Sequence, residues 1–237
     1  MSEIIVLDAI PFQFDSGELS AKLHLTEDDA EISRAWKNLI GNVTALARPK
    51  ALFRECSVDA VTEDTVVAEG VPLKSRVMVR QLGERRRLFV YCATCGTETA
   101  VLEESLDPLE RFWLEELRLA LLRRALAYLR GEISRRYRIP KLAGMAPGSG
   151  DADVWPLEEQ IPLFERLLEG RVTESIGVEL TDSLLMVPCK SSSGVLFAAE
   201  HDFTTCQLCH RKNCPERRSP RRSPLLQASS TTPTKMV

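Results

Sequence analysis

The stretch MAPGSGDADVWPLEEQ (residues 145–160) places two glycines and a serine in a tight loop, directly before a segment that begins like a helix. Glycine-rich loops before helices often bind phosphate, because backbone N–H groups and the helix N-terminus attract an anion. This loop has neither the Gly-Lys-Ser/Thr sequence nor the Gly-x-Gly-x-x-Gly spacing of the common phosphate sites. A free linker is also disfavoured, because the residues that follow include Trp155, which we expect to be buried and to anchor the loop.

The composition predicts a folded protein of one large domain or two small ones. The chain has 237 residues, of which 44% are hydrophobic, and its formal net charge is −3. A chain of this length buries a sizeable core, whereas a nucleic-acid or anionic-membrane surface would need a basic balance. The N-terminus MSEIIVLDAI lacks the features of a signal peptide, and no run approaches the roughly 20 apolar residues that span a bilayer. We therefore expect a soluble, cytoplasmic protein that binds neither nucleic acid nor membranes.

Apolar periodicity predicts both helices and strands. A helix is predicted over residues 26–47 with Thr26 as its N-cap, another over 108–138 from apolar residues at three-and-four spacing, and a third from Pro156 to Gly170. Strand-like runs lie between them, at residues 3–10, 52–61, 65–73, 75–82, 86–96, 178–187 and 194–203. Helices and strands interleave irregularly, which favours an α+β sheet over a strictly parallel α/β fold.

The order of several motifs carries a resemblance to a known family. The loop APGSGD is followed by WPLEEQIPLFERLL, then by IGVELTDSLLMVPCKSSSGVLFAA, and CATCGTE precedes the long predicted helix. In this order the motifs resemble the activation domain of cobalamin-dependent methionine synthase, especially its short stand-alone members. That family has an Arg-x-Ser/Ala-Pro-Gly-Tyr-Gly-Asp loop before a Pro-Leu-x-x-Gln helix. The resemblance covers roughly residues 4–203.

The resemblance implies a fold and a role. The fold would be a twisted, mainly antiparallel sheet with flanking helices over residues 1–203, followed by a cysteine cluster at 204–216. Residues 217–237 are rich in Ser, Pro and Arg and are predicted to be a disordered tail. The implied role is to bind S-adenosylmethionine and dock on a corrinoid-carrying methionine synthase or related methyltransferase. An electron donor then reduces the inactive cobalt, and the cobalamin bound by the partner is remethylated.

The resemblance also implies site residues. The backbone at Ala146, Pro147 and Gly148 would line the S-adenosylmethionine site, where a glycine permits close approach of the ligand. Glu132, on the long predicted helix, would match an acidic contact of the family.

Two positions depart from the family pattern. Gly144 stands where the family has the loop arginine, and Ser149 stands where it has the tyrosine. Arginine makes a forked contact to a carboxylate, so the loss of both side chains should weaken the site. Arg135 and Lys141 are candidates to supply the missing cation.

The C-terminal cysteines predict a metal site. Cys206, Cys209 and Cys214 have the spacing C-x2-C-x4-C, whose first pair suits one metal ion. Either an iron–sulfur cluster, which would suit electron delivery, or a structural zinc ion fits three thiolates. Unligated, reduced thiols are the competing interpretation. The candidates for a fourth ligand are Cys189, His201, His210 and a cysteine of the pair Cys92–Cys95, although that pair ends an apolar strand and suits core packing equally well.

Three functions follow from these observations. The leading hypothesis is an accessory protein for the reductive reactivation of a corrinoid methyltransferase. The alternative is a non-catalytic metal-binding or electron-transfer module that has lost the methyl-donor site. An independent S-adenosylmethionine-dependent methyltransferase ranks last, because the glycine loop does not follow a first Rossmann-like strand.

Overall fold

The computed structural model describes residues 2–25, 29–150, 154–201, 203–214, 217 and 219–222. Its strands are β1 (Ile5–Leu7), β2 (Lys50–Val61), β3 (Thr65–Ala68), β4 (Val71–Lys74), β5 (Arg87–Thr94), β6 (Leu142–Met145), β7 (Glu179–Leu180), β8 (Met186–Val187) and β9 (Ser191–Ala198). Its main helices are α1 (Ser16–Lys22), α2 (Ala30–Leu46), α3 (Arg76–Leu82), α4 (Pro108–Tyr137) and α6 (Val172–Ile176). Shorter helical turns are η1 (Glu98–Ser105), η2 (Leu157–Glu159), α5 (Gln160–Pro162), η3 (Leu163–Leu167) and η4 (Thr205–Gln207).

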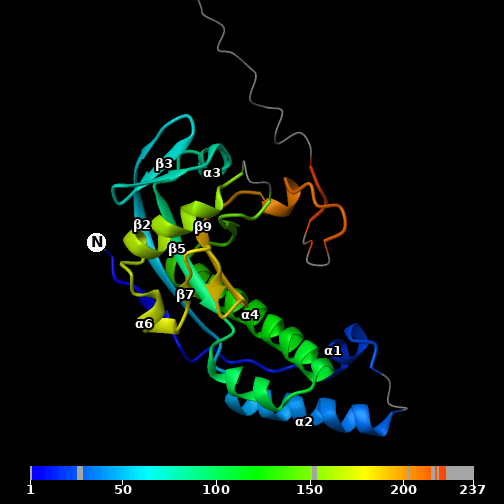
Figure 1. Cartoon of the computed structure of the whole chain (residues 1–237). Helices are drawn as coiled ribbons and strands as arrows, with labels where there is room; N and C mark the ends of the chain where they lie inside the picture. Colours follow the sequence, from blue (N-terminus) through cyan, green and yellow to red (C-terminus); the bar gives the residue numbers. More distant parts are fainter. Residues whose placement is uncertain are drawn as a thin grey trace, which may run out of the picture.

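The main sheet is antiparallel and curls across the molecule (Figure 1). Its strand order is β4-β3-β2-β5-β9-β6, with β1 paired to β2. Each neighbouring pair in this order is antiparallel. The predicted α+β fold with a mainly antiparallel sheet and flanking helices is therefore confirmed.

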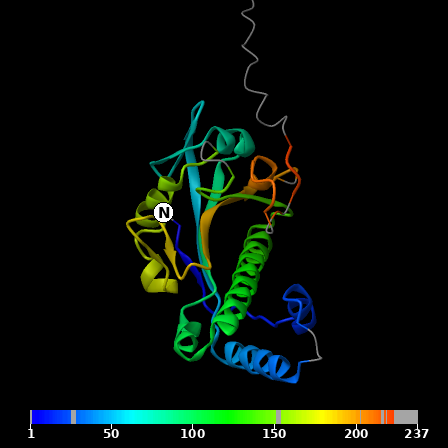
Figure 2. The ribbon, with the colours of Figure 1, turned by 45° about the vertical axis from the view of Figure 1, so that its right-hand side comes forward.

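Helices cover both faces of the sheet because its central strands are apolar on both sides. Successive side chains of a strand point to opposite faces. On β5, Leu88 and Val90 join the core beneath the segment 163–178, whereas Phe89 and Tyr91 join the core beneath α4. Figure 2 shows α4 on one side of the sheet and the helical turns of residues 157–176 on the other. β5 is accordingly buried along almost its whole length.

The long helix α4 connects two cores. The Asp107 carboxylate caps it by accepting hydrogen bonds from the N–H groups of Leu109 and Glu110, and the Asp107 N–H donates to the Glu110 carboxylate. The first half of α4 packs against α2, where Trp113 meets Trp36 edge to face at 5.7 Å between ring centroids. The second half packs against the sheet, as the path of α4 in Figure 1 shows. The helix predicted over residues 108–138 is confirmed, with its end at Tyr137.

A buried arginine ties the sheet to the helical turns on its other face. Arg54 of β2 is 1% exposed, and its guanidinium donates to the carbonyl oxygen of Leu167 at 2.9 Å. It also pairs with the carboxylate of Glu169 at 3.2 Å and donates from Nε to the Ser2 carbonyl oxygen. Removing one partner of a buried charge is costly, so these contacts fix the position of residues 167–169 over the sheet.

Several predicted elements were wrong in type or extent. Residues 75–82, a predicted strand, form α3 instead, because Ser75 caps the helix and Met78 and Leu82 bury one helical face. The run at 178–187 is not one strand but the short hairpin β7–β8, closed by the Thr181–Leu185 turn. The third predicted helix is a series of short turns, η2, α5 and the π-helical η3.

The helix predicted over residues 26–47 is confirmed as α2, which begins at Ala30 and is capped by Asp29. Thr26, the predicted cap, lies outside the described residues, as does most of the predicted tail. In the part of the chain that the structure describes, no helix has both the length and the apolar character needed to cross a membrane.

Ser75 should contribute measurably to stability, because its buried hydroxyl serves two elements. It accepts from the Met78 N–H at 3.1 Å and donates to the Val154 carbonyl oxygen at 2.5 Å. Ser75→Ala removes a helix cap and leaves a carbonyl without its donor, so we expect a loss of about 2 kcal/mol in the free energy of unfolding. Urea unfolding measures this. Ser105→Ala, at an exposed hydroxyl, is the control and should stay within about 0.5 kcal/mol of wild type; equal losses in the two variants would contradict the assignment.

Candidate functional site: a groove beside the edge strand β6

The pairing of β6 with β9 places the loop that follows β6. Leu142 pairs with Ala198 and Met145 with Val195, so the chain leaves the sheet at Ala146, beside the first half of β9. On its other side, β6 forms a parallel bridge from Gly144 to Thr204. The loop is therefore held between β9 and the C-terminal segment.

Two hollows lie beside this loop, and Ala146 and Ser192 line both of them. We call them the Arg130 hollow, of about 200 Å³, and the Leu184 hollow, of about 380 Å³, and together the groove. The Arg130 hollow is lined by Tyr91, Leu126, Leu129, Arg130, Gly144, Met145, Ala146, Ser149, Ser192, Leu196 and Thr205. The Leu184 hollow is lined by Ala146, Pro147, Leu157, Gln160, Leu184, Leu185, Met186, Val187, Cys189, Ser191, Ser192 and Ser193. The two volumes together fall within the range of about 300–1,000 Å³ typical of small-molecule sites.

Polar groups converge on the Arg130 hollow from three elements. The hydroxyls of Ser149 and Thr205 lie 2.7 Å apart and join the loop to η4. Arg130 reaches in from α4 and donates to the carbonyl oxygen of Leu142. The hollow thus combines one guanidinium with several hydroxyls, a set suited to a ligand that has both anionic and hydrogen-bonding groups.

The Leu184 hollow is more apolar. Its lining includes Leu157 and the hairpin residues Leu184, Leu185 and Val187, and Leu185 and Val187 are exposed large hydrophobic residues. Gln160 is buried at its floor, where its amide donates to the Leu184 carbonyl oxygen at 3.2 Å. This half of the groove suits a flat apolar group with hydrogen-bonding edges.

The three predicted loop residues differ in whether they line the groove. Ala146 lines both hollows and Pro147 lines the Leu184 hollow, whereas Gly148 lines neither. Gly148 has a φ of 71°, and a Cβ there would lie 2.8 Å from Leu157 Cδ1. Glycine at this position therefore serves the backbone turn and the contact with Leu157.

Glu132 lies outside the groove. Its carboxylate accepts hydrogen bonds from Arg135 and Arg136, and the Arg135 guanidinium above all holds the pKa of Glu132 below its usual range. Arg135 and Lys141, the candidate replacements for the family arginine, do not line the groove either. Glu132 as a ligand contact therefore stays a prediction.

A side chain at Gly144 would meet the ends of two neighbouring side chains. A Cβ at this position would lie 2.7 Å from Leu196 Cδ2 and 3.1 Å from Arg130 Nη1. An arginine there would have to displace both neighbours. The side chain of Arg130, which comes from α4, occupies the space beside β6 instead.

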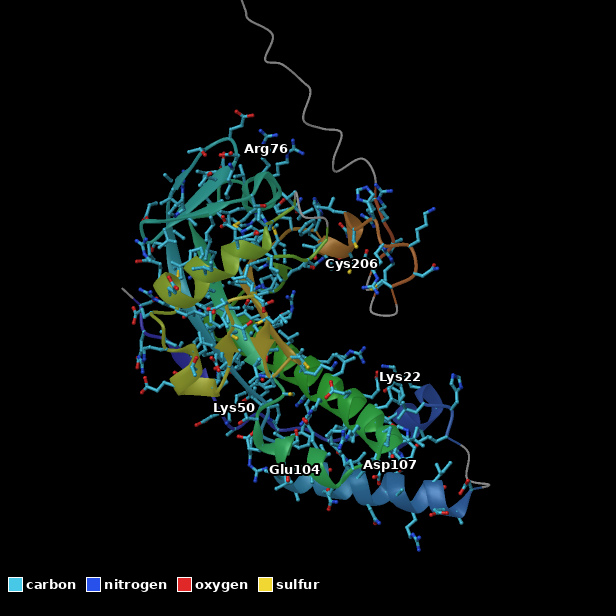
Figure 3. All side chains as sticks on the ribbon, in the orientation of Figure 1. Lys22, Lys50, Arg76, Glu104, Asp107 and Cys206 are labelled. Carbon is cyan, nitrogen blue, oxygen red and sulfur yellow. The ribbon has the colours of Figure 1, made fainter. Side chains whose placement is uncertain are left out.

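The described residues give no support to the predicted metal centre at the C-terminal cysteines. Among the described residues, which include Cys206, Cys209 and Cys214, no three His, Cys, Asp or Glu side chains come together as a possible metal site. Figure 3 shows Cys206 on the C-terminal segment, between the end of the molecule that carries Arg76 and the end that carries Asp107. The Arg217 guanidinium donates to the carbonyl oxygens of Cys206 and Cys209, so this side chain holds the turn through its backbone. A metal site at these cysteines therefore stays a prediction.

The segment that carries these cysteines belongs partly to the main core. Phe203 and Leu208 are buried with residues of the sheet and of the segment 163–178. Thr205 is buried as well and reaches the Arg130 hollow. The start of the predicted cysteine unit thus contributes to the groove.

The sequence did not single out Arg130, Ser192 or Thr205 as site residues. Arg130 sits in a helix with many other arginines, and Thr205 lies next to a cysteine pair that draws attention first. The pairing of β6 with β9 and with Thr204 brings Ser192 and Thr205 to the loop, and the packing of α4 beside β6 adds Arg130. The run of three serines at 191–193 was a usable signal for Ser192, because all three serines line the Leu184 hollow.

A comparison with solved structures finds a similar fold. The chain aligns with the crystal structure of the MetH reactivation domain bound to AdoHcy with a TM-score of 0.60 and 16% sequence identity. The alignment covers 85% of this chain and 80% of that one. The two chains share a fold. Family models and curated proteins gave no match to the sequence.

Thiol reactivity should separate the cysteines into two classes. Burial raises the pKa of Cys56 to about 12 and that of Cys95 to about 11, and it raises the pKa of Cys92 as well. At pH 8 these three should resist a thiol-specific reagent in the native state, because the thiolate is the reactive form. Cys189, Cys206, Cys209 and Cys214 are exposed or half-buried and should react first.

Mass spectrometry after a short reaction identifies the modified positions. Adding zinc beforehand should leave this pattern unchanged. Joint protection of Cys206, Cys209 and Cys214 by zinc would contradict this expectation and would support the predicted metal site.

Proposed function

We propose that this protein binds S-adenosylmethionine in the groove beside β6 and assists the reductive reactivation of a corrinoid methyltransferase, such as a methionine synthase. The supporting observation is that a chain with the fold of the MetH reactivation domain has a groove at the loop where the sequence resemblance implies the ligand site. AdoHcy, the ligand of that domain, is what remains of S-adenosylmethionine after its methyl group has been given away.

The groove has the chemical character that this ligand requires. S-adenosylmethionine has an adenine and a ribose at one end and a zwitterionic amino acid at the other. The Leu184 hollow offers apolar walls and the amide of Gln160, whereas the Arg130 hollow offers a guanidinium and hydroxyls. Apolar walls with a few placed polar groups are typical of nucleoside sites.

The role follows from the chemistry of the partner. An inactive corrinoid cobalt(II) returns to methylcobalamin when it takes one electron and a methyl cation, and S-adenosylmethionine leaves as AdoHcy. The electron would come from a separate donor and the corrinoid from the partner protein. This chain would hold the methyl donor and present it at the mouth of the groove.

The alternative of a metal-binding electron-transfer module is not favoured. Among the described residues, no three potential metal ligands come together. The groove, by contrast, is lined in part by residues of the main-sheet strands β5, β6 and β9.

A reactivation assay tests the proposal. An oxidised, cobalamin-loaded methionine synthase that lacks its own reactivation domain is supplied with an electron donor and S-adenosylmethionine, with and without this protein. We expect recovery of methyl transfer only when the protein is present. Recovery equal to the buffer control would contradict the proposal.

A variant that fills the groove should abolish this recovery. Ala146→Phe places a ring between the two hollows, and overpacking typically costs about 1–3 kcal/mol, so we expect a loss of affinity for AdoHcy of about 5- to 150-fold. Ala127→Phe, on the exposed face of α4, is the matched control and should bind like wild type. Calorimetry measures both, and unchanged binding by Ala146→Phe would place the ligand elsewhere.

A further inference from the structure

The groove has one charged group among its described lining residues. That group is Arg130; the others are apolar or have hydroxyl, amide or thiol groups. A carboxylate that enters a half-buried hollow loses water and needs a compensating donor. The charge distribution of the groove is therefore polarised, with its cationic end in the Arg130 hollow.

The position of Arg130 is set by its neighbours. Its Nη2 donates to the carbonyl oxygen of Leu142 at the start of β6. Its Nη1 stands 3.1 Å from where a Cβ of residue 144 would lie, so the guanidinium runs along β6 where Gly144 leaves space. A guanidinium has five N–H donors in a rigid plane, and a bond to a backbone carbonyl orients that plane.

We propose that Arg130 binds the carboxylate at the amino-acid end of the nucleoside ligand and thereby sets the ligand's direction in the groove. This inference rests on the proposed function. The amino-acid end lies in the smaller Arg130 hollow, near the hydroxyls of Ser149 and Thr205, and the adenosine lies in the larger Leu184 hollow. The cation is thus supplied by the helix α4 and not by the loop.

The size of the two hollows supports this direction. The Leu184 hollow has nearly twice the volume of the Arg130 hollow, in agreement with the larger bulk of adenosine. Its apolar wall of Leu157, Leu184 and Val187 suits an aromatic base and would not stabilise a carboxylate.

Two ligands separate the carboxylate contact from general binding. AdoHcy has the amino-acid end, whereas 5′-methylthioadenosine has the same adenosine and thioether without it. In calorimetry, Arg130→Gln should weaken AdoHcy binding by about 10- to 100-fold, as expected for a lost charge-assisted hydrogen bond. The affinity for 5′-methylthioadenosine should change by less than about twofold, and Arg130→Lys should lose less AdoHcy affinity than Arg130→Gln.

Arg124→Gln is the matched control. Arg124 lies on the same helix and also donates to a backbone carbonyl, that of Pro11, but it is outside the groove. It should leave both affinities unchanged, and thermal melts of all variants check folding. Equal weakening of both ligands by Arg130→Gln, or weakening of neither, would overturn the role of Arg130. Failure of the wild-type protein to bind either ligand would instead overturn the proposed function.

Discussion

The antiparallel pairing of β6 with β9 is the constraint on which the groove depends. It sets Gly144 opposite Leu196 and Met145 opposite Val195, so that the loop from Ala146 leaves the sheet next to Ser192. The free side of β6 then accepts Thr204, which brings the C-terminal segment and the hydroxyl of Thr205 against Ser149. A one-residue slip in this register would turn the side chains of β6 to the opposite face and separate these groups.

The rest of the fold holds this edge rigid from both sides. α4 packs on one face of the sheet through Leu129 and Ile133. Arg130, which follows Leu129 on this helix, reaches the carbonyl oxygen of Leu142 at the start of β6. On the other face, buried Arg54 anchors the turn at Leu167, which continues from the helical turns that carry Gln160. The groove thus draws its polar groups from elements that the cores already fix in place, and a ligand would meet a preformed site.

The sequence predicted those parts of this structure that local pattern controls. The helix at 108–138 was evident from its apolar spacing, and β2 and β5 from their apolar runs. α3 was missed because its valines favour a strand locally, while the Ser75 cap and the burial of Met78 decide for a helix. In the site, Ala146 and Pro147 were predicted from the loop motif. Arg130 was not, because its proximity to the loop arises only when α4 packs across β6.

The measurement that tests the account most directly is a crystal structure of the protein with AdoHcy. The account predicts the ligand in the groove, its adenine against Leu157 and Leu184 and its carboxylate within hydrogen-bonding distance of the Arg130 guanidinium. A ligand bound away from Ala146 and Ser192 would contradict the assignment of the site. A ligand in the groove whose carboxylate points away from Arg130 would contradict the proposed direction.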